Sequence, residues 1–372
     1  MKANLLYILV LGFCFQAAAQ WSDQSFMFGG LEREYKLYVP LSYDSNRPAS
    51  LIVTLHGMGD DRNNFSQVGF DRAAETSNYI VVVPQAISDK YAGTTWNAQA
   101  GLLGYYPNKD VDDIGFINAI IDTVESQYAI NSGNVFLCGF SMGGFMAQRM
   151  ACEANSKFSA IASVAGTLGN NLSSCHPGRS IPIAHFHGTK DFTVGYYANG
   201  FGLKVDSLIH LWMVNNNCDT VAVKNILPHG SEDTIIVEHY LYQGDDNVEL
   251  YKVNGGGHVW FEKPPYSISY VNEIMKFFGK YEKVSGIAKY EKIQTLKIYP
   301  NPTDNFIAID VPQLMHNAQL KLYDLSGRLI YENQVSEKQV NLSLKEFNLN
   351  SGTYVISLAD NNNYVTQKVI LN

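Results

Sequence analysis

A serine, an aspartate and a histidine follow one another along the chain in surroundings that suit nucleophilic catalysis. Ser141 is the central residue of a Gly-x-Ser-x-Gly pattern at 139–143, and Asp191 and His258 come later in short loops. A serine hydroxyl is a weak nucleophile at neutral pH and needs a base that a carboxylate orients. The order and spacing therefore predict Ser141 as nucleophile, His258 as base and Asp191 as the orienting acid.

The elements around Ser141 are those that such a nucleophile requires. An apolar run at 134–138 predicts a buried strand, and helix-forming residues at 145–151 predict a helix directly after it. A sharp strand-to-helix turn exposes the serine hydroxyl at its tip, the arrangement called a nucleophile elbow. We expect Gly139 and Gly143 to be required because the turn brings backbones too close for a Cβ atom.

The acid and the base each follow a predicted strand. Asp191 comes after the apolar run 181–186, and His258 comes after the run 248–253 and three glycines. Other carboxylates fit less well, because they precede the serine, lie in a predicted helix or follow the histidine: Asp112, Asp113, Asp206 and Glu262. The remaining candidate bases lie in or beside strands and helices, where a histidine is more often structural: His185, His187, His210 and His239.

An oxyanion hole is predicted after the strand 51–55, where His56-Gly57-Met58-Gly59 follows. The second backbone donor of such a site normally comes from this position, and the first from the residue after the nucleophile. We therefore expect the N–H groups of Met58 and Met142 to bind the oxyanion, with His56 supporting their loop.

Strands alternate with helices through residue 283, which predicts an α/β fold with a mostly parallel sheet covered on both faces. An alternating pattern at 26–38 predicts an antiparallel edge hairpin, and Asp113 is expected to cap a helix over 114–127. The stretch 88–109 shows no period and is expected to be a long surface loop.

Four aromatic residues in loops are candidates for pocket or surface contacts with the substrate: Trp96, Tyr105, Tyr106 and Trp260. Packing within the protein explains each of them equally well at this stage.

Composition changes near residue 285. Short alternating runs separated by Asn-Pro, Ser-Gly and Asn-Asn turns predict a small all-β sandwich over 285–372, after the α/β domain at 20–284.

The bulk properties exclude several function classes. The chain has 372 residues and a formal net charge of −8, without a concentrated basic stripe, which argues against a nucleic-acid partner. Neither paired Cys/His spacing nor His-Glu-x-x-His occurs, and the elbow lacks Gly-x-Gly-x-x-Gly. We expect no metal and no cofactor.

The first residues predict export. Lys2, an apolar run too short to span a membrane and Ala17-Ala18-Ala19 describe a signal peptide at 1–19. Cys138 lies in the predicted buried strand and is expected to be a free thiol. Three further cysteines can form at most one disulfide, whose pairing the sequence leaves open: Cys152, Cys175 and Cys218.

Six stretches together resemble the secreted esterase family that includes polyhydroxybutyrate depolymerases and feruloyl esterases: 51–59, 111–116, 139–144, 162–166, 187–191 and 255–260. The resemblance implies an α/β-hydrolase fold and a catalytic triad of Ser141, Asp191 and His258. Two departures adjoin the catalytic loops, since Val259-Trp260-Phe261 replaces Thr-Trp-Pro and Gly195 replaces a proline after Val194. They affect the expected substrate rather than the expected chemistry.

The end of the chain resembles the type A sorting domain of the type IX secretion system. Four stretches carry the resemblance: 299–302, 323–327, 351–354 and 368–371. It implies export across the outer membrane by that machinery, followed by removal of the domain or surface attachment. A carbohydrate-binding sandwich is the alternative reading.

The sequence as a whole predicts a secreted serine esterase that acts through an acyl-enzyme on feruloyl or acetyl esters of plant-wall polysaccharide, a polymeric substrate. The first alternative is a polyhydroxybutyrate or other aliphatic polyester depolymerase. A peptidase and an inactive hydrolase fold that serves as a surface binding protein are less favoured. The oligomeric state is left open.

Overall fold

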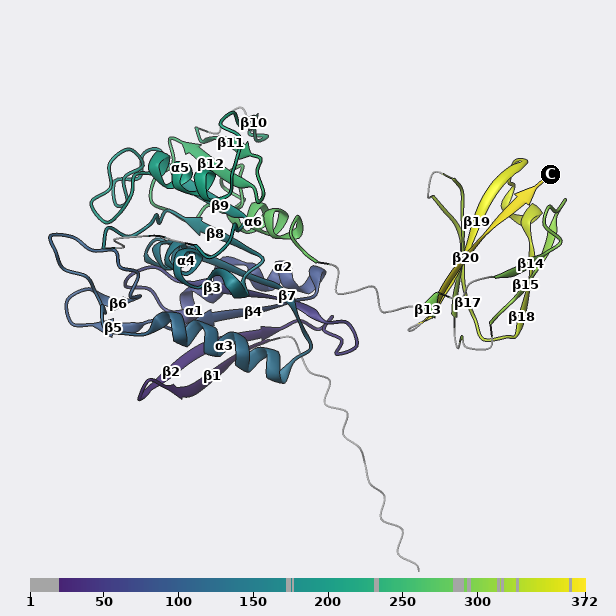
Figure 1. Cartoon of the computed structure of the whole chain (residues 1–372), viewed down its shortest axis with the longest axis horizontal. Coiled ribbons are helices and arrows are strands. Elements are labelled where there is room, and N and C mark those ends of the chain that lie inside the picture. Colours follow the sequence, from purple (N-terminus) through teal and green to yellow (C-terminus); the bar gives the residue numbers. More distant parts are fainter. Residues whose placement is uncertain are drawn as a thin grey trace, which may run out of the picture. The chain divides into compact units, whose positions relative to one another are not determined.

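The computed structural model describes residues 20–171, 175, 177–230, 234–283, 291–292, 296–312, 315, 318–325, 328–360 and 363–372. The chain divides into two compact units, Met1–Lys283 and Val284–Asn372 (Figure 1). The predicted signal peptide at 1–19 and the boundary near residue 285 lie outside the described residues. Within the described part, none of the helices combines the length and apolar character needed to cross a membrane.

One large sheet organises the first unit. Its spatial order is β1-β2-β4-β3-β7-β8-β9-β12-β11-β10. The six central strands are parallel, and two antiparallel strands flank them at each edge. The strand bounds are β1 Gln20–Phe28, β2 Leu31–Val39, β3 Ala49–Leu55, β4 Tyr79–Pro84, β7 Ile130–Phe140, β8 Ala160–Val164, β9 Ile183–Gly188, β10 Val223–Ile226, β11 Ile236–Tyr242 and β12 Val248–Asn254.

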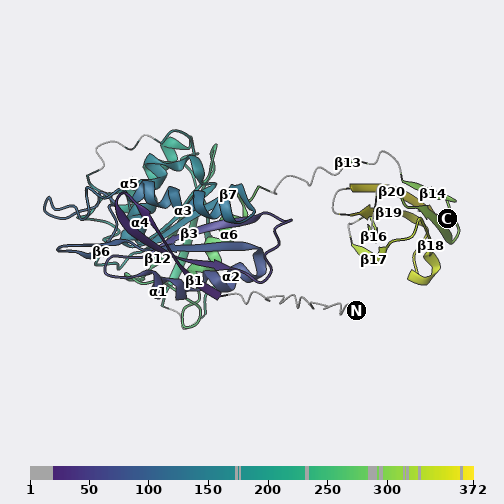
Figure 2. The same cartoon turned by 90° about the horizontal axis from the view of Figure 1, so that it is seen from below.

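Helices cover both faces of this sheet, as the alternation of strands and helices predicts. The bounds are α1 Arg62–Phe65, η1 Ser66–Val68, α2 Phe70–Ser77, α3 Asp113–Gln127, α4 Met142–Glu153, η2 Asn155–Lys157, α5 Val205–Asn215 and α6 Tyr270–Gly279. α3 and α5 lie on one side of the sheet and α1 and α2 on the other (Figure 2).

Two apolar cores result, one on each face. β3 is buried along its whole length; Leu51 and Val53 face the core that α3, α4 and α5 cover, whereas Ile52 faces the core of α2 and α6. A strand buried on both faces has no polar side, which explains the continuous apolar runs in the sequence. The predicted α/β fold is confirmed.

The helical structure after β3 is interrupted at Gly69, whose φ of +103° lies in the left-handed region and separates η1 from α2. The start of α3 differs from the prediction. Asp112, not Asp113, caps α3, because its side chain accepts a hydrogen bond from the Gly115 N–H at 2.8 Å. Asp113 is instead fully buried and accepts a hydrogen bond from Arg33 Nη2 at 2.7 Å.

The stretch 88–109 is a surface loop only in part, because Tyr91 and 102–105 are exposed whereas 95–98 is buried in the core. It begins with a two-stranded hairpin, β5 Ile87–Asp89 and β6 Gly93–Thr95. Directly afterwards Trp96 is fully buried, and the Asn97 N–H donates to Asp113 Oδ2 at 2.7 Å. The buried carboxylate therefore holds this segment against α3.

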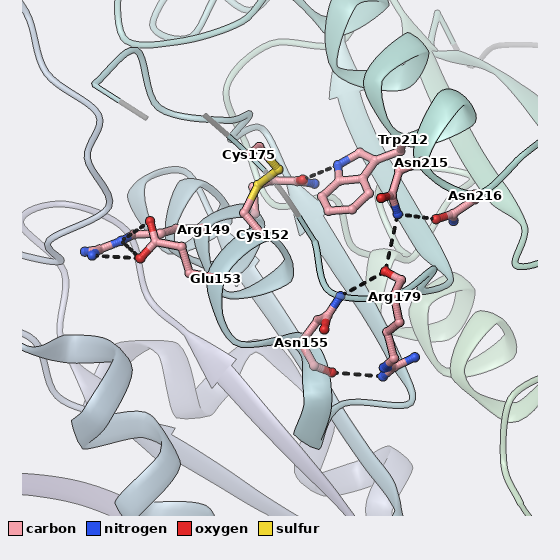
Figure 3. The surroundings of a disulfide bond; sticks show 10 residues. Arg149, Cys152, Glu153, Asn155, Cys175, Arg179, Trp212, Asn215 and Asn216 are labelled. Carbon is pink, nitrogen blue, oxygen red and sulfur yellow. Dashed lines mark hydrogen bonds and ion pairs between the residues drawn. A yellow bond between two sulfur atoms is a disulfide. The ribbon is translucent and has the colours of Figure 1, made fainter. Parts of the chain in front are cut away.

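One disulfide joins Cys152, in the last turn of α4, to Cys175 (Figure 3). Cys138 and Cys218 are free, and burial raises the pKa of the Cys138 thiol. The prediction of one bridge at most and a core thiol at Cys138 is confirmed. Beside the bridge, Asn155 and Arg179 exchange two hydrogen bonds that fix the chain entering β9.

The second unit consists of two β-sheets around one apolar core. A five-stranded sheet has the order β13-β20-β19-β16-β17, and a three-stranded sheet has the order β14-β15-β18. Ile307 and Ile309 of the small sheet share a core with Leu320, Leu322 and Ile356 of the large one. The bounds are β13 Glu291–Lys292, β14 Lys297–Tyr299, β15 Phe306–Asp310, β16 Ala318–Tyr323, β17 Leu329–Val335, β18 Gln339–Ser343, η3 Leu344–Phe347, β19 Gly352–Ala359 and β20 Asn363–Leu371. The prediction of an all-β second domain is confirmed.

Candidate active site

Ser141 stands between β7 and α4 in a conformation that side chains rarely adopt. Its φ is +55° and its ψ is −119°. Such strained backbone persists only where the surrounding structure enforces it. Here the Ser141 N–H donates to the Val164 carbonyl at 2.8 Å, and its own carbonyl accepts from the Phe145 N–H at 3.0 Å. The turn holds the serine at the carboxyl end of a central strand.

The glycines of the elbow allow this turn, as the sequence predicts. A Cβ atom on Gly139 would lie 2.0 Å from the Gly143 carbonyl oxygen. A Cβ atom on Gly143 would lie 2.1 Å from the Leu55 carbonyl oxygen, which connects the elbow to the end of β3. Both distances are far shorter than any side-chain contact, so neither position accepts another residue without a backbone shift.

Asp191 lies in the loop that follows β9. Its Oδ1 accepts hydrogen bonds from the Thr193 N–H at 2.9 Å and the Val194 N–H at 2.8 Å. Its side chain is fully buried. Two backbone donors on one oxygen hold the carboxylate and leave Oδ2 to face His258.

His258 lies in the loop that follows β12, and this loop is tied to the acid loop. The Lys190 N–H donates to the Gly256 carbonyl at 2.8 Å, and the Gly255 N–H donates to Thr189 Oγ1 at 2.9 Å. The ring of Phe140 supports the imidazole, with 5.1 Å between ring centroids. The two loops therefore form one rigid end of the sheet.

The structure brings the three predicted residues together. The Ser141 Oγ–H donates to His258 Nε2 at 2.9 Å, and His258 Nδ1–H donates to Asp191 Oδ2 at 2.7 Å. The imidazole side chain is 17% exposed, so it faces both the buried carboxylate and the solvent. This geometry allows a proton to leave the serine while the carboxylate fixes the histidine tautomer.

The predicted oxyanion donors lie on two segments that meet at Ser141. Met142 is the first residue of α4, so its N–H has no partner inside the helix and points out of the helix start. Gly57 precedes Met58, and a Cβ atom on Gly57 would lie 3.3 Å from the Ser141 Cβ. The loop after β3 thus passes directly beside the serine.

His56 supports this loop, as expected from the sequence. Its Nε2 accepts a hydrogen bond from the Ala86 N–H at 3.1 Å, so Nδ1 carries the proton and donates to the Gly57 carbonyl at 2.8 Å. Burial lowers the pKa of His56, which keeps the ring neutral. A neutral, doubly bonded ring is not available as a base.

A small apolar pocket of about 240 Å³ lies beside the loop after β3. Met58 lines it together with Tyr91, Leu102, Tyr105 and Phe201. Of the predicted pocket aromatics, only Tyr105 is among the residues that line this pocket. The sequence analysis missed Met58, Tyr91, Leu102 and Phe201 as pocket residues. They lie in loops without sequence periodicity, and only the position of these loops at the carboxyl ends of the strands could have indicated them.

Trp96 is not a substrate contact, so that prediction was wrong. Its side chain is fully buried, and its Nε1–H donates to the His56 carbonyl at 2.9 Å. The indole fills the space beneath the loop after β3 and supports it from inside.

Trp260 packs within an aromatic cluster behind His258. Its ring lies within about 6 Å of the rings of Phe65, Phe70, Phe140 and Tyr270. Its Nε1 is buried. The structure gives Trp260 a packing role under the base loop, so its contact with substrate stays a prediction.

The histidines judged structural in the sequence include two that are buried near the acid loop. His185 and His187 of β9 are both fully buried. A hydrogen bond of 3.0 Å joins His185 Nε2 to His187 Nδ1. His239 pairs with Glu249 at 2.7 Å, at a distance from the serine along the sheet. Among the described residues, no three His, Cys, Asp or Glu side chains gather to form a site that could hold a metal ion.

Two family models match the chain. Residues 42–201 match a phospholipase/carboxylesterase model, and residues 297–372 match a secretion system C-terminal sorting domain. The first match includes Ser141 and Asp191 and ends before His258. Both matches agree with the resemblances that the two parts of the sequence show.

Curated relatives match the first part. The chain is 29% identical over 168 residues to a bifunctional acetylxylan esterase/xylanase, XynS20E, of Neocallimastix patriciarum, covering 45% of this chain and 22% of the relative. It is 28% identical over 238 residues to feruloyl esterase D of Neurospora crassa, covering 63% of this chain and 77% of the relative. Several other curated relatives are matched over 55% of their length.

A solved structure of an acetyl xylan esterase from Aspergillus awamori shares the fold. It superimposes with a TM-score of 0.51 at 16% identity, covering 69% of this chain and 99% of the other. At this identity the likeness concerns the fold alone, and it agrees with the predicted α/β-hydrolase architecture.

Proposed function

Since residues 42–201 match a phospholipase/carboxylesterase model and residues 297–372 match a sorting-domain model, we propose that the chain is a serine ester hydrolase that works through an acyl-enzyme. The observation that carries the proposal is the pair of hydrogen bonds from Ser141 to His258 and from His258 to Asp191, at 2.9 Å and 2.7 Å. Hydrolysis is assigned to residues 20–284, and residues 285–372 serve export.

In the first half-reaction, Ser141 Oγ attacks the ester carbonyl carbon while its proton passes to His258 Nε2. The buried Asp191 carboxylate stabilises the imidazolium that forms. The Met58 and Met142 N–H groups donate to the oxyanion of the tetrahedral intermediate; loss of one such donor typically costs about 10²–10³-fold in kcat. The intermediate collapses when the alcohol leaves with the proton from His258.

In the second half-reaction, water replaces the alcohol. His258 Nε2 removes a proton from water as the oxygen attacks the acyl carbon, and it returns the proton to Ser141 Oγ as the acid leaves. One ester and one water become one acid and one alcohol. All proton transfers pass through one imidazole nitrogen, 2.9 Å from the serine oxygen.

The proposed substrate is a feruloyl or acetyl ester of a plant-wall polysaccharide. The names of the curated relatives support this class, as does the apolar pocket beside Met58, whose volume of about 240 Å³ suits a small acyl group. The rings of Tyr91 and Tyr105 line this pocket edge to face, with 5.6 Å between their centroids. They offer apolar surface to an acyl chain or ring.

An aliphatic polyester is the second candidate, and one observation favours it. Leu103 and Phe192 are 98% and 94% exposed, and both lie on loops at the same edge of the sheet as Ser141. Large apolar side chains held in solvent beside a catalytic site suit contact with a water-insoluble polymer.

The sorting domain places the protein outside the cell or at the cell surface, which confirms the expected location. An external enzyme meets polymeric substrates directly. After export, the sorting domain is either removed or used for surface attachment. The mass of the exported protein distinguishes these two outcomes.

The experiment that tests the function measures p-nitrophenyl acetate hydrolysis by the full chain and by Ser141→Ala. We expect the variant to lose nearly all turnover, and equal turnover would contradict the proposal. A panel of methyl ferulate, acetylated xylan and polyhydroxybutyrate film then assigns the substrate. Preference for the film would replace the plant-wall assignment by the polyester one.

A further inference from the structure

A chain of buried polar side chains runs through the core of the first unit to the acid loop. Its members belong to five segments, each linked to the next by a hydrogen bond: Trp212 of α5, Gln148 of α4, Ser163 of β8, His185 and His187 of β9, and Val194 of the acid loop. The side chains are fully buried. Polar groups in an apolar core cost free energy unless each is paired, so this arrangement requires an explanation.

The direction of every hydrogen bond follows from the acid-loop end. The Val194 carbonyl can only accept, so His187 Nε2 carries a proton and donates to it at 2.7 Å. A neutral His187 then has an unprotonated Nδ1, which accepts from His185 Nε2–H at 3.0 Å. By the same logic His185 Nδ1 accepts from the Ser163 hydroxyl at 2.7 Å.

The opposite end gives the same answer independently. The Trp212 indole N–H can only donate, so the atom of Gln148 that receives it at 2.7 Å is the amide oxygen. The amide nitrogen of Gln148 therefore donates to Ser163 Oγ at 2.6 Å, which leaves the Ser163 proton free to go to His185. Figure 3 shows the Trp212 indole, the first member of this hydrogen-bonded series, beside the disulfide on α4.

Burial keeps both histidines in the neutral form that this pattern needs. It lowers the pKa of His185 well below 6.5, with a smaller contribution from His187. It also lowers the pKa of His187, against the opposing effect of the Val194 carbonyl. Each ring thus carries one proton, on Nε2.

This series of hydrogen-bonded side chains ends beside the Asp191 carboxylate, which faces His258. His187 Nε2 lies 3.5 Å from Asp191 Oδ2, the oxygen that accepts from His258. The Val194 N–H binds Asp191 Oδ1, whereas its carbonyl is held by His187. His187 therefore holds the turn that orients Asp191 from behind.

We propose that Gln148, Ser163, His185 and His187 form a one-way hydrogen-bond relay, with His187 as the positioning residue for the acid of the triad. The inference rests on the proposed function, since it needs Asp191 to be the acid. The relay connects α4, the helix that begins directly after the nucleophile, with the loop that carries the acid. Two parts of the site that are 50 residues apart in sequence are thereby held in one geometry.

The kinetic test compares His187→Phe with His187→Gln and with a matched control. Phenylalanine keeps the ring shape without the hydrogen bonds, and we expect kcat to fall about 10²-fold, the typical cost of a small misplacement of a catalytic group. KM should stay within about twofold, because Asp191 does not contact substrate. His187→Gln restores a donor toward Val194 and should recover part of kcat.

The control is His239→Phe on β11, which removes a half-buried histidine that pairs with Glu249, four strands away from β7 in the sheet. We expect it to lower the unfolding midpoint and to leave kcat of the folded enzyme unchanged. A purely structural role for His187 predicts this same result for His187→Phe, which would overturn the inference. Ser163→Ala breaks the relay further from the acid and should give a smaller fall in kcat than His187→Phe.

A second measurement needs no variant that could fail to fold. Histidine ring ¹⁵N–¹H spectra of the full chain report which nitrogen carries the proton. We expect His185 and His187 as neutral Nε2–H rings and His56 as the Nδ1–H ring. A charged His187, or one protonated on Nδ1, would overturn the relay.

Failure of the relay and failure of the proposed function are distinguishable. If Ser141→Ala is inactive while His187→Phe keeps the kcat of the wild-type chain, the relay alone is wrong. If Ser141→Ala retains full turnover, the proposed function is wrong whatever the ring spectra show.

Discussion

Asp191 is held on both oxygens, and this explains how its buried carboxylate stays aligned. Oδ1 accepts the Thr193 and Val194 N–H groups, and Oδ2 accepts the His258 ring proton. The charge is thus bound by short donors rather than by a cation. In this arrangement the carboxylate selects the tautomer of His258 that leaves Nε2 free for the serine.

Asp191→Asn should lower kcat by about 10⁴-fold with little change in KM, since an amide in this place favours the wrong tautomer of the histidine. The measurement is steady-state hydrolysis of p-nitrophenyl acetate. Asp206→Asn, on α5, serves as the matched control and should keep wild-type turnover. A fall of less than about tenfold for Asp191→Asn would remove this residue from the proposed triad.

The elbow glycines make a second prediction at this scale. Gly143→Ala would put a Cβ atom 2.1 Å from the Leu55 carbonyl oxygen, so the turn and the oxyanion loop must move apart. We expect a loss of at least about 1–3 kcal/mol in the free energy of unfolding, together with loss of turnover. Gly279→Ala is the control, because no atom lies within 4 Å of its added Cβ. Equal stability of the two variants would contradict the account of the turn.

The elements of the sheet were predictable where burial leaves a pattern in the sequence. β3 and β4 are buried on both faces and appear as continuous apolar runs, and the turn after β7 carries its own glycine signature. β10 could not be found in this way, because all four of its residues are exposed and no face is apolar. Apolar patterns in a sequence arise from burial, so an exposed edge strand has no such pattern.

Contacts between distant elements account for the other differences. Trp96 is buried because its segment is fastened to Asp113, and Asp113 is paired with Arg33, 80 residues before it. The relay through Ser163 and His185 likewise joins residues of separate elements. A local pattern cannot show either arrangement, although two histidines two residues apart in a buried strand were a signal that one face of β9 was polar.

The disulfide makes a prediction at the scale of the element. It links α4 to a segment 23 residues later, and closing a loop of this length stabilises a protein by about 3 kcal/mol in the chain-entropy account. Cys152→Ala/Cys175→Ala should lower the unfolding free energy by roughly this amount while keeping most turnover. Cys218→Ala is the control. An unchanged unfolding curve for the double variant would show that the bridge does not form.

The whole molecule combines a rigid hydrolase unit with a separate β-sandwich that carries the sorting signal. The hydrolase unit holds three buried neutral histidines, His56, His185 and His187, with lowered pKa values that burial causes. The unfolded chain takes up protons on all three below their ordinary value of 6.5, whereas the folded chain resists protonation. Folded stability must therefore fall as the pH falls through this value.

We expect the free energy of unfolding to decrease between about pH 7.5 and about pH 5, by up to about 2 kcal/mol for each histidine that stays neutral. All four tryptophans lie before residue 283, so urea unfolding followed by tryptophan fluorescence reports the hydrolase unit alone. His187→Phe should show a smaller decrease than wild type. Stability that is constant or rises toward pH 5 would contradict the neutral assignment.

The proposed function depends on the acylation of Ser141 during turnover. The most direct measurement quenches the full chain with acid shortly after mixing with p-nitrophenyl acetate and determines the mass of the peptide that contains Ser141. We expect a gain of one acetyl group on that serine in the wild-type chain and none in Ser141→Ala. Turnover of the ester by a chain whose acetyl group appears on another residue, or on none while Ser141→Ala remains active, would contradict it.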